Sequence, residues 1–198
     1  MFNVVGLAIP STFVQKKKFL VLLDRDGTLI DDIPYLGDTA MVNFIPNVIE
    51  VLKKLNNLCC FVIVSNQSGI ERKLVTENAV LSVFEIIKSK LLSDNIDIIG
   101  YVFCPHESSS NCYCRKPSPY MLNYVRKEMN FSVENTIYIG NNDSDLYAGH
   151  GAGIMTLICD KNYSNPDYPN NLPLGWDEIY EFLSAYLENI GKINSLGI

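Results

Sequence analysis

Five short, continuous apolar runs constrain the fold of this chain more than any other feature of its sequence. They read FLVLL, CCFVIVS, IIGYVFC, TIYIG and IMTLIC. Continuous runs of this length, rich in β-branched residues, are typical of strands buried on both faces of a sheet. Helical patterns lie between and after them, at residues 46–57, 76–93, 117–129, 144–150 and 176–190. Strands that alternate with helices predict an α/β fold, a Rossmann-like, doubly wound parallel sheet.

Three residues indicate where helices begin. Thr76 precedes Glu77 and an apolar-periodic stretch, as an N-cap residue does. Pro46 and Pro117 fit first-turn positions, where the missing backbone N–H costs nothing. We therefore expect helices to start at these three points.

The length of 198 residues predicts one core and one domain. We place that domain at residues 17–198 and treat residues 1–16, which have no clear periodicity, as an N-terminal extension. No gap between the predicted strands is long enough for a large cap domain. We expect the protein to be a monomer.

Charge and hydropathy exclude several classes of partner. The formal net charge of −6 argues against nucleic acid, whose binding depends on lysine and arginine. No stretch approaches the roughly 20 apolar residues that span a bilayer, so we expect no membrane partner. The short N-terminal run VVGLAIP has no basic segment before it, which argues against a signal peptide. We therefore expect a cytoplasmic protein whose six cysteines are free thiols or metal ligands.

Polar residues follow four of the predicted strands. In open parallel sheets, ligands bind outside the carboxyl ends of the strands, so these residues should meet at one edge of the sheet. Each alone could be a solvated turn, but four coincidences favour a site. They are residues 24–28, residues 65–67, Cys104 with His106, and residues 141–145.

The first of these motifs, LLDRDGT, carries the strongest chemical signal. Asp24 and Asp26, two residues apart beyond a strand, can act as nucleophile and general acid/base if Gly27 allows the turn. A strand followed by DxDGT resembles the haloacid dehalogenase-like phosphatases. That resemblance implies that Asp24 attacks phosphorus to form an aspartyl-phosphate. It implies that Asp26 protonates the leaving alkoxide and then activates the hydrolytic water.

Two further motifs supply groups for a phosphorylated substrate. In SNQSGI, the resemblance implies that Ser65 donates a hydrogen bond to the phosphoryl group and that Asn66 orients the substrate. In CRKPSP, Lys116 is our choice for the cation that stabilises the phosphoryl oxygens, and the planar fork of Arg115 suits a sugar phosphate. We add Thr28 to the substrate-binding set.

The motif YIGNNDSD should supply ligands for catalytic Mg²⁺, which prefers oxygen. We expect the ligand set to be Asp24, Asp26, Asn141 and Asp145. The resembling phosphatases carry aspartate where this chain has Asn141 and lysine where it has Asn142. Because Asn141 brings no negative charge, Mg²⁺ affinity or rate should be lower unless a nearby aspartate compensates. Capping of the following helix is the alternative role for its aspartates.

The pattern C-x-H-x5-C-x-C predicts a zinc site. Its members are Cys104, His106, Cys112 and Cys114. Three thiolates and one imidazole complete a tetrahedral Zn²⁺ shell, and a closed shell is structural because it leaves no position for water. Zinc would then order a loop that has few apolar residues.

Together these motifs narrow the resemblance within the class. Over residues 19–158 their order is similar to that in D-glycero-D-manno-heptose 1,7-bisphosphate 7-phosphatases and their near relatives, the histidinol-phosphatases, which lack a large cap domain. The resemblance implies Mg²⁺-dependent hydrolysis of a small phosphorylated metabolite. We favour removal of the heptose 7-phosphate because Arg115 and Lys73 offer charge for a second phosphate. The alternatives are histidinol phosphate as the substrate, a sugar-phosphate-binding module with weak or no turnover, and nucleic-acid end processing.

Overall fold

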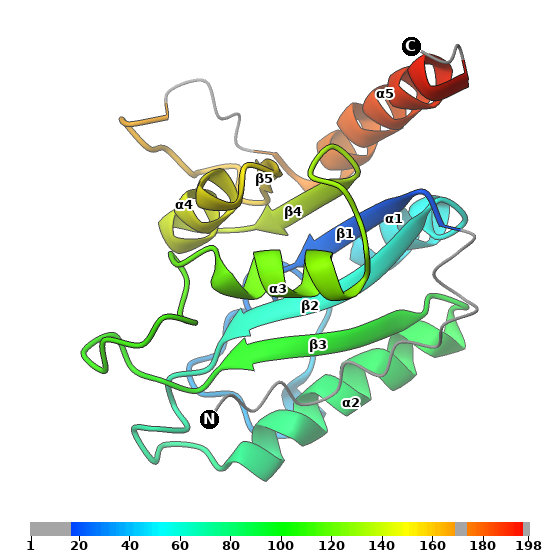
Figure 1. The fold of residues 1–198 in the computed structure, drawn as a ribbon. Coiled ribbons are helices and arrows are strands. Elements are labelled where there is room, and N and C mark those ends of the chain that lie inside the picture. The colour runs from blue at the N-terminus through cyan, green and yellow to red at the C-terminus, as the bar shows by residue number, and fades with distance from the viewer. Residues whose placement is uncertain (1–16, 169–173, 196–198) are drawn as a thin grey trace.

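The computed structural model describes residues 17–168 and 174–195, and its centre is a parallel sheet (Figure 1). The strand order β3-β2-β1-β4-β5 is that of a doubly wound fold. The strands are β1 (Phe19–Leu23), β2 (Cys59–Asn66), β3 (Ile98–Cys104), β4 (Thr136–Gly140) and β5 (Met155–Ile158). The helices are α1 (Val48–Leu55), α2 (Glu77–Ser93), α3 (Tyr120–Glu128), α4 (Asp143–Ala152) and α5 (Trp176–Ser195), with a short 3-10 turn η2 (Thr39–Met41).

Strand β1 shows why the apolar runs are continuous. Phe19, Val21 and Leu23 pack into one core with α1, α2 and α5. Leu20 and Leu22 point the other way, into a second core with α3 and α4. In Figure 1, α3 lies in front of the sheet and α1 behind it. Because successive side chains enter opposite layers, every position of this central strand is apolar, and the predicted fold class is confirmed.

The predicted helix starts were correct at one point and wrong at two. Thr76 is the N-cap of α2, and its side chain accepts a hydrogen bond from the Ala79 backbone N at 3.2 Å. Pro46 lies outside α1, because the N-cap residue Asn47 has a left-handed backbone with φ of 69°.

Pro117 lies outside α3, which begins at Tyr120. The side chain of Asn66 holds the preceding residue, Lys116, by its backbone. Asn66 Nδ2 donates to the Lys116 carbonyl at 3.1 Å, and the Lys116 N–H donates to Asn66 Oδ1 at 3.0 Å. Lys116 and Pro117 lie instead in a turn, in which the Ser118 N–H donates to the Arg115 carbonyl at 2.9 Å, and the helix begins only after it.

Two of the connections that leave the strands are long, but neither forms a domain. Within the described residues, these connections run from residue 24 to the start of α1 and from residue 105 to the start of α3. Neither connection forms an additional layer of helices or strands over the sheet, as expected for a chain without a large cap domain. Residues 1–16 lie outside the described residues, so the boundary at residue 17 stays a prediction. Among the helices described, none is long and apolar enough to cross a bilayer.

Candidate active site

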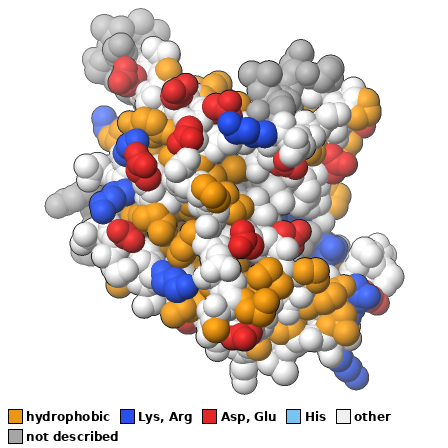
Figure 2. All heavy atoms as spheres, turned by 180° about the vertical axis from the view of Figure 1, so that it is seen from behind, with side chains coloured by type: hydrophobic (Ala, Val, Ile, Leu, Met, Phe, Trp, Pro, Cys, Tyr) orange, Lys and Arg blue, Asp and Glu red, His pale blue; other side chains and the backbone are white. Residues whose placement is uncertain are grey.

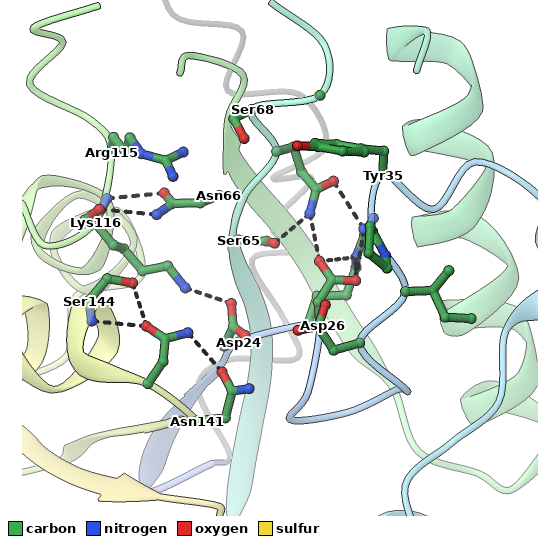
Figure 3. Close-up of a pocket in the computed structure, with 17 residues that line it drawn as sticks. Asp24, Asp26, Tyr35, Ser65, Asn66, Ser68, Arg115, Lys116, Asn141 and Ser144 are labelled. Carbon is green, nitrogen blue, oxygen red and sulfur yellow. Dashed lines mark hydrogen bonds and ion pairs between the residues drawn. The ribbon is translucent and has the colours of Figure 1, made fainter. Parts of the chain in front are cut away.

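A cavity of about 440 Å³ opens at the carboxyl ends of the strands (Figure 3). Residues that follow β1, β2 and β4 line it, together with the segment that leads into α3. The predicted residues that line it are Asp24, Asp26, Ser65, Asn66, Arg115, Lys116 and Asn141. Residues up to 117 positions apart in the sequence thus share one pocket because parallel strands present their carboxyl ends at the same edge.

Lys116 is the centre of the site. Its ammonium donates to Asp24 Oδ1 at 2.5 Å and to Asp145 Oδ1 at 2.6 Å, and it also contacts the Tyr138 hydroxyl at 2.9 Å and the Val64 carbonyl at 3.2 Å. The side chain is 2% exposed. A buried ammonium between two carboxylates is therefore paired on both sides, as a buried charge requires.

The ionisable side chains around Lys116 shift one another's pKa values. Burial raises the pKa of Asp24 to about 7, with the Lys116 ammonium acting in the opposite direction and the carboxylates of Asp145 and Asp26 adding to the rise. Burial by itself would lower the pKa of Lys116, but Asp145 and Asp24 outweigh it and the pKa is raised. The lysine therefore stays a cation, and a further positive charge at the site would favour the ionised form of Asp24.

Asp145 lies beneath the pocket. It is fully buried, and its Oδ1 accepts bonds from Lys116 and from the Tyr138 hydroxyl. Its Oδ2 accepts the backbone N–H groups of Asn141 at 3.0 Å and Asn142 at 3.3 Å, which forms a capping box at the start of α4. Both carboxylate oxygens are thus engaged in capping the helix and anchoring the lysine. The geometry favours this role over direct contact with an ion.

Asn141 does line the pocket, beside the turn that follows Asp24. A Cβ atom on Gly27, whose φ is +76°, would come within 2.0 Å of the Asn141 side-chain nitrogen. The glycine is required there both by its backbone angle and by this close packing. Asn141 Oδ1 accepts a bond from Asn142 at 2.9 Å. Asp143, the remaining acid of the motif, does not line the cavity and bonds instead to Tyr163 and Asn165.

Asp24 and Asn141 offer the types of ligand atom that magnesium binds, but only one of the two side chains carries a negative charge. Within the described residues no hydrogen bond reaches Asp24 Oδ2, and Asn141 offers an amide oxygen on the same cavity wall. Carboxylate and amide oxygens are hard ligands that suit Mg²⁺. With Asp145 engaged beneath the pocket, Asp24 is the only anion of this pair.

Arg115 lines the pocket and also contacts the loop at residues 105–114, called the cysteine loop below. Its Nη1 donates to the His106 carbonyl at 3.0 Å. Arg115 thus couples the pocket wall to the loop that carries the predicted zinc ligands. Thr28, in contrast, does not line the cavity: it is fully buried, and its backbone carbonyl accepts the Trp176 indole N–H at 2.9 Å. Sequence could not separate Thr28 from its neighbours because the pattern does not show which side chains of the turn after β1 face the cavity.

Among the pocket residues without a predicted role, two contact a predicted catalytic group. Arg25 and Gln67 line the cavity, and both bond to the Asp26 carboxylate. Each lies next to a predicted residue, just beyond a strand, and this position was the only signal in the sequence. Their side chains turned out to be buried and paired, which the pattern alone did not indicate.

The four predicted zinc ligands come together where the cysteine loop leaves β3, with Cys104 and Cys114 buried. Their ligand atoms lie within 4.8 Å of one another. The Sγ–Sγ separations are 2.9, 3.6 and 3.7 Å, and the His106 Nδ1 lies 3.5 and 3.4 Å from the sulfurs of Cys104 and Cys114. Zn–S bonds of about 2.3 Å in a tetrahedron imply sulfur separations of about 3.8 Å. Two of the three sulfur separations are close to this value and the Cys104–Cys114 separation is shorter; the three thiols and one imidazole fit a structural zinc site.

A strand-end aspartate pair, a buried lysine and a strand-end serine on a doubly wound sheet define a class. The protein is a phosphatase of the haloacid dehalogenase-like class.

Comparisons with known proteins give the family. The family model described as "Polynucleotide kinase 3 phosphatase" matches residues 20–174, and the chain belongs to this family. It is 33% identical over 143 residues to a D-glycero-alpha-D-manno-heptose-1,7-bisphosphate 7-phosphatase of Photorhabdus laumondii, covering 68% of this chain and 78% of the relative. It is 36% identical over 145 residues to a D-glycero-beta-D-manno-heptose-1,7-bisphosphate 7-phosphatase of Haemophilus influenzae, covering 70% and 79%.

A solved structure agrees on the fold. The D,D-heptose 1,7-bisphosphate phosphatase from B. bronchiseptica, crystallised with magnesium and phosphate, superposes with a TM-score of 0.74 at 20% identity. The match covers 84% of this chain and 98% of that one. At this identity the likeness concerns the fold, and the motifs and the sequence relatives carry the family.

Proposed function

We propose that this protein hydrolyses the 7-phosphate of D-glycero-D-manno-heptose 1,7-bisphosphate through an aspartyl-phosphate on Asp24. The observation that carries the proposal is the buried contact of 2.5 Å between Lys116 and Asp24, in a pocket lined by residues of the motifs LLDRDGT, SNQSGI, CRKPSP and YIGNNDSD. Relatives more than 30% identical that are named as 7-phosphatases of this sugar support the choice of substrate.

In the first step, a carboxylate oxygen of Asp24 attacks phosphorus. The bond between phosphorus and the sugar oxygen breaks, and Asp26 gives its proton to that oxygen, so that the sugar leaves as an alcohol. Lys116 holds the attacking carboxylate in place and stabilises the charge on the phosphoryl oxygens. Ser65, 1% exposed and on the cavity wall, can donate its hydroxyl hydrogen to the same oxygens.

In the second step, water attacks the phosphorus of the aspartyl-phosphate. Asp26 takes a proton from that water, the bond between phosphorus and Asp24 breaks, and inorganic phosphate leaves. Asp24 is then a carboxylate again and Asp26 again carries a proton. The two aspartates therefore complete a cycle in which protons and electron pairs balance.

Magnesium belongs to the same proposal. Asp24 and Asn141 would hold the ion, while Asp26 would act on the leaving group and Asp145 would anchor Lys116. When bound, the ion supplies positive charge against the phosphoryl oxygens. The proposed ligand set is thus narrower than the four residues expected from the sequence, because Asp145 is already engaged on both oxygens.

The pocket also offers a reason to keep histidinol phosphate as a second candidate. Its imidazole and amine require acidic or aromatic neighbours, and Asp32 and Tyr35 both line the cavity. The second phosphate of a bisphosphate requires a positive charge, and Arg115, which also lines the cavity, offers one. Lys73, expected to assist with the second phosphate, does not line this cavity and instead borders a separate surface pocket beside α2. The relatives favour the heptose.

Other candidate functions have weaker support. A module that only binds a sugar phosphate has no need of Asp24 in contact with Lys116. Nucleic acid would require a basic channel, whereas the face in Figure 2 shows basic side chains scattered among acidic ones, and the net charge is −6. Action as a monomer and a cytoplasmic location both stay part of the proposal.

The test is release of phosphate with Mg²⁺ from heptose 1,7-bisphosphate, histidinol phosphate and a 3′-phosphorylated oligonucleotide, measured in parallel. Asp24→Asn serves as the blank. We expect release from the heptose substrate that the substitution abolishes, with one phosphate released per molecule. Preferred turnover of histidinol phosphate or of the oligonucleotide would replace the heptose as the substrate. No release from any of them would favour the binding module.

A further inference from the structure

The carboxylate of Asp26 is held by two buried side chains that do not themselves face a reacting atom in the proposed chemistry. Arg25 Nε lies 3.0 and 3.1 Å from the two carboxylate oxygens, and Arg25 Nη2 lies 2.9 Å from Oδ1. Gln67 Nε2 donates to Oδ2 at 2.8 Å. Asp26 itself keeps a side-chain exposure of 20%, so its carboxylate is held by buried partners and is still accessible from the cavity.

The amide of Gln67 has a partner for each of its polar atoms. Its Oε1 accepts a bond from Arg25 Nη2 at 3.0 Å. Its two N–H hydrogens go to Asp26 Oδ2 and to Ser65 Oγ, each at 2.8 Å. An amide has one carbonyl oxygen and two N–H donors, so this set of bonds determines its orientation. Rotating the amide by half a turn would place its oxygen against the carboxylate, which repels it.

Arg25 fixes the other end of this arrangement. Its side chain is 1% exposed, and its guanidinium lies 5.0 Å from the centre of the Phe84 ring in α2. The Phe84 ring stacks in turn on Tyr101 of β3, with centroids 4.3 Å apart. The guanidinium therefore cannot shift without disturbing the core, and Gln67, bound to it, is held equally firmly.

We propose that Gln67 is a positioning residue for the proton transfers of Asp26, with Arg25 fixing the direction of its amide. The inference rests on the proposed function, because it needs Asp26 to be the acid and base of phosphoryl transfer. Gln67 neither touches phosphorus nor exchanges a proton. It holds the Asp26 carboxylate at the angle from which a proton reaches the leaving oxygen. Its second hydrogen bond makes Ser65 Oγ an acceptor and leaves the Ser65 O–H free to donate to the phosphoryl group.

The test compares two substrates that differ in their need for a proton. The alkoxide that leaves heptose 1,7-bisphosphate must be protonated, whereas the phenolate that leaves 2,4-dinitrophenyl phosphate does not need to be. The value of kcat/KM for each reports the first phosphoryl transfer, before the second step can limit the rate. Wild type, Gln67→Leu and Gln67→Glu are assayed on both. Asn78→Leu, which removes an exposed amide from α2, is the matched control.

We expect both Gln67 variants to lose about 10–100-fold in kcat/KM on the heptose substrate and less than about 3-fold on the dinitrophenyl substrate, since misplacing a general acid forfeits part of its usual contribution. Asp26→Asn should show the same contrast, at least as large. In the Asp26→Asn background, Gln67→Leu should add no further contrast, because the two residues act through one step.

The two Gln67 variants control for different structural effects of the substitution. Gln67→Leu keeps the volume without adding charge, and Gln67→Glu keeps an oxygen for Arg25, so that variant should fold if the leucine variant does not. Equal losses on the two substrates, or no loss, would overturn the positioning role. Wild-type protein inactive on both substrates would instead overturn the proposed function. Wild-type activity that depends on Asp24, with equal losses in the variants, would refute the inference about Gln67 alone.

Discussion

Replacing Lys116 with methionine should remove a large part of the stability of the folded chain. The ammonium is 2% exposed and lies between Asp24 at 2.5 Å and Asp145 at 2.6 Å. Methionine fills a similar volume but leaves two buried carboxylates without a cation. Removing one partner of a buried ion pair costs about 3–5 kcal/mol, which is a substantial share of the roughly 5–15 kcal/mol that keeps a typical domain folded.

Urea unfolding followed by tryptophan fluorescence measures this loss. The chain has one tryptophan, Trp176, and its side chain is buried, so its signal reports unfolding directly. With a urea dependence of about 2 kcal/mol per molar, the midpoint should fall by about 1.5–2.5 M. Lowering the pH toward about 4 should recover part of the loss, because protonation removes the uncompensated charge.

A surface lysine provides the matched control. Lys161 pairs with Glu178 at 3.1 Å, but both side chains are about half exposed or more. Exposed pairs contribute about 0–1 kcal/mol, so Lys161→Met should shift the midpoint by less than about 0.5 M. A Lys116→Met midpoint no lower than that of the control would refute the view that the lysine neutralises a buried acidic pair.

Three further predictions concern the metals. Protein purified without added metal should contain about one zinc per chain, and Cys112→Ser should lose it and unfold at a lower temperature. Cys159→Ser, outside the cluster, should keep its zinc, and loss of zinc there would contradict the assignment. Asn141→Asp should strengthen Mg²⁺ dependence by adding a charge, measured as a lower Mg²⁺ concentration for half-maximal phosphate release; no change would mean that another acid already fills the role. The pKa of Asp24, raised from 3.8 to about 7, implies that this group favours folding below about pH 4 and that its contribution is lost as the pH rises to about 7. Magnesium, which binds the ionised carboxylate, should therefore raise the melting temperature more at pH 8 than at pH 5, and Asp24→Asn should abolish that difference.

The sheet and the gathering of motifs could be predicted because both follow from repeated, local patterns. Every residue of β1 is apolar since each contacts one of two cores, and a run of that kind is visible in the sequence. Once the strands are parallel, their polar ends must meet. Asp24, Ser65, Lys116 and Asn141 share a pocket for this reason.

The side-chain partners could not be predicted in the same way. Asp145 and Asn141 belong to one motif, yet one is buried under Lys116 and the other lines the cavity. The difference depends on the turn into α4, where two backbone N–H groups donate hydrogen bonds to one carboxylate oxygen of Asp145. Pro117 was misjudged for a similar reason, because the contact that keeps it out of α3 comes from Asn66, 50 positions away from the residue it binds.

The bond between Trp176 and the backbone of Thr28 joins residues 148 positions apart. During synthesis the segment with the predicted nucleophile is made before the helix that anchors it. A chain that stops before α5 therefore lacks the indole that holds this turn. Such a fragment would have the sequence motifs of a phosphatase without the contact that holds its catalytic turn, so we expect activity to appear only after α5 has been made.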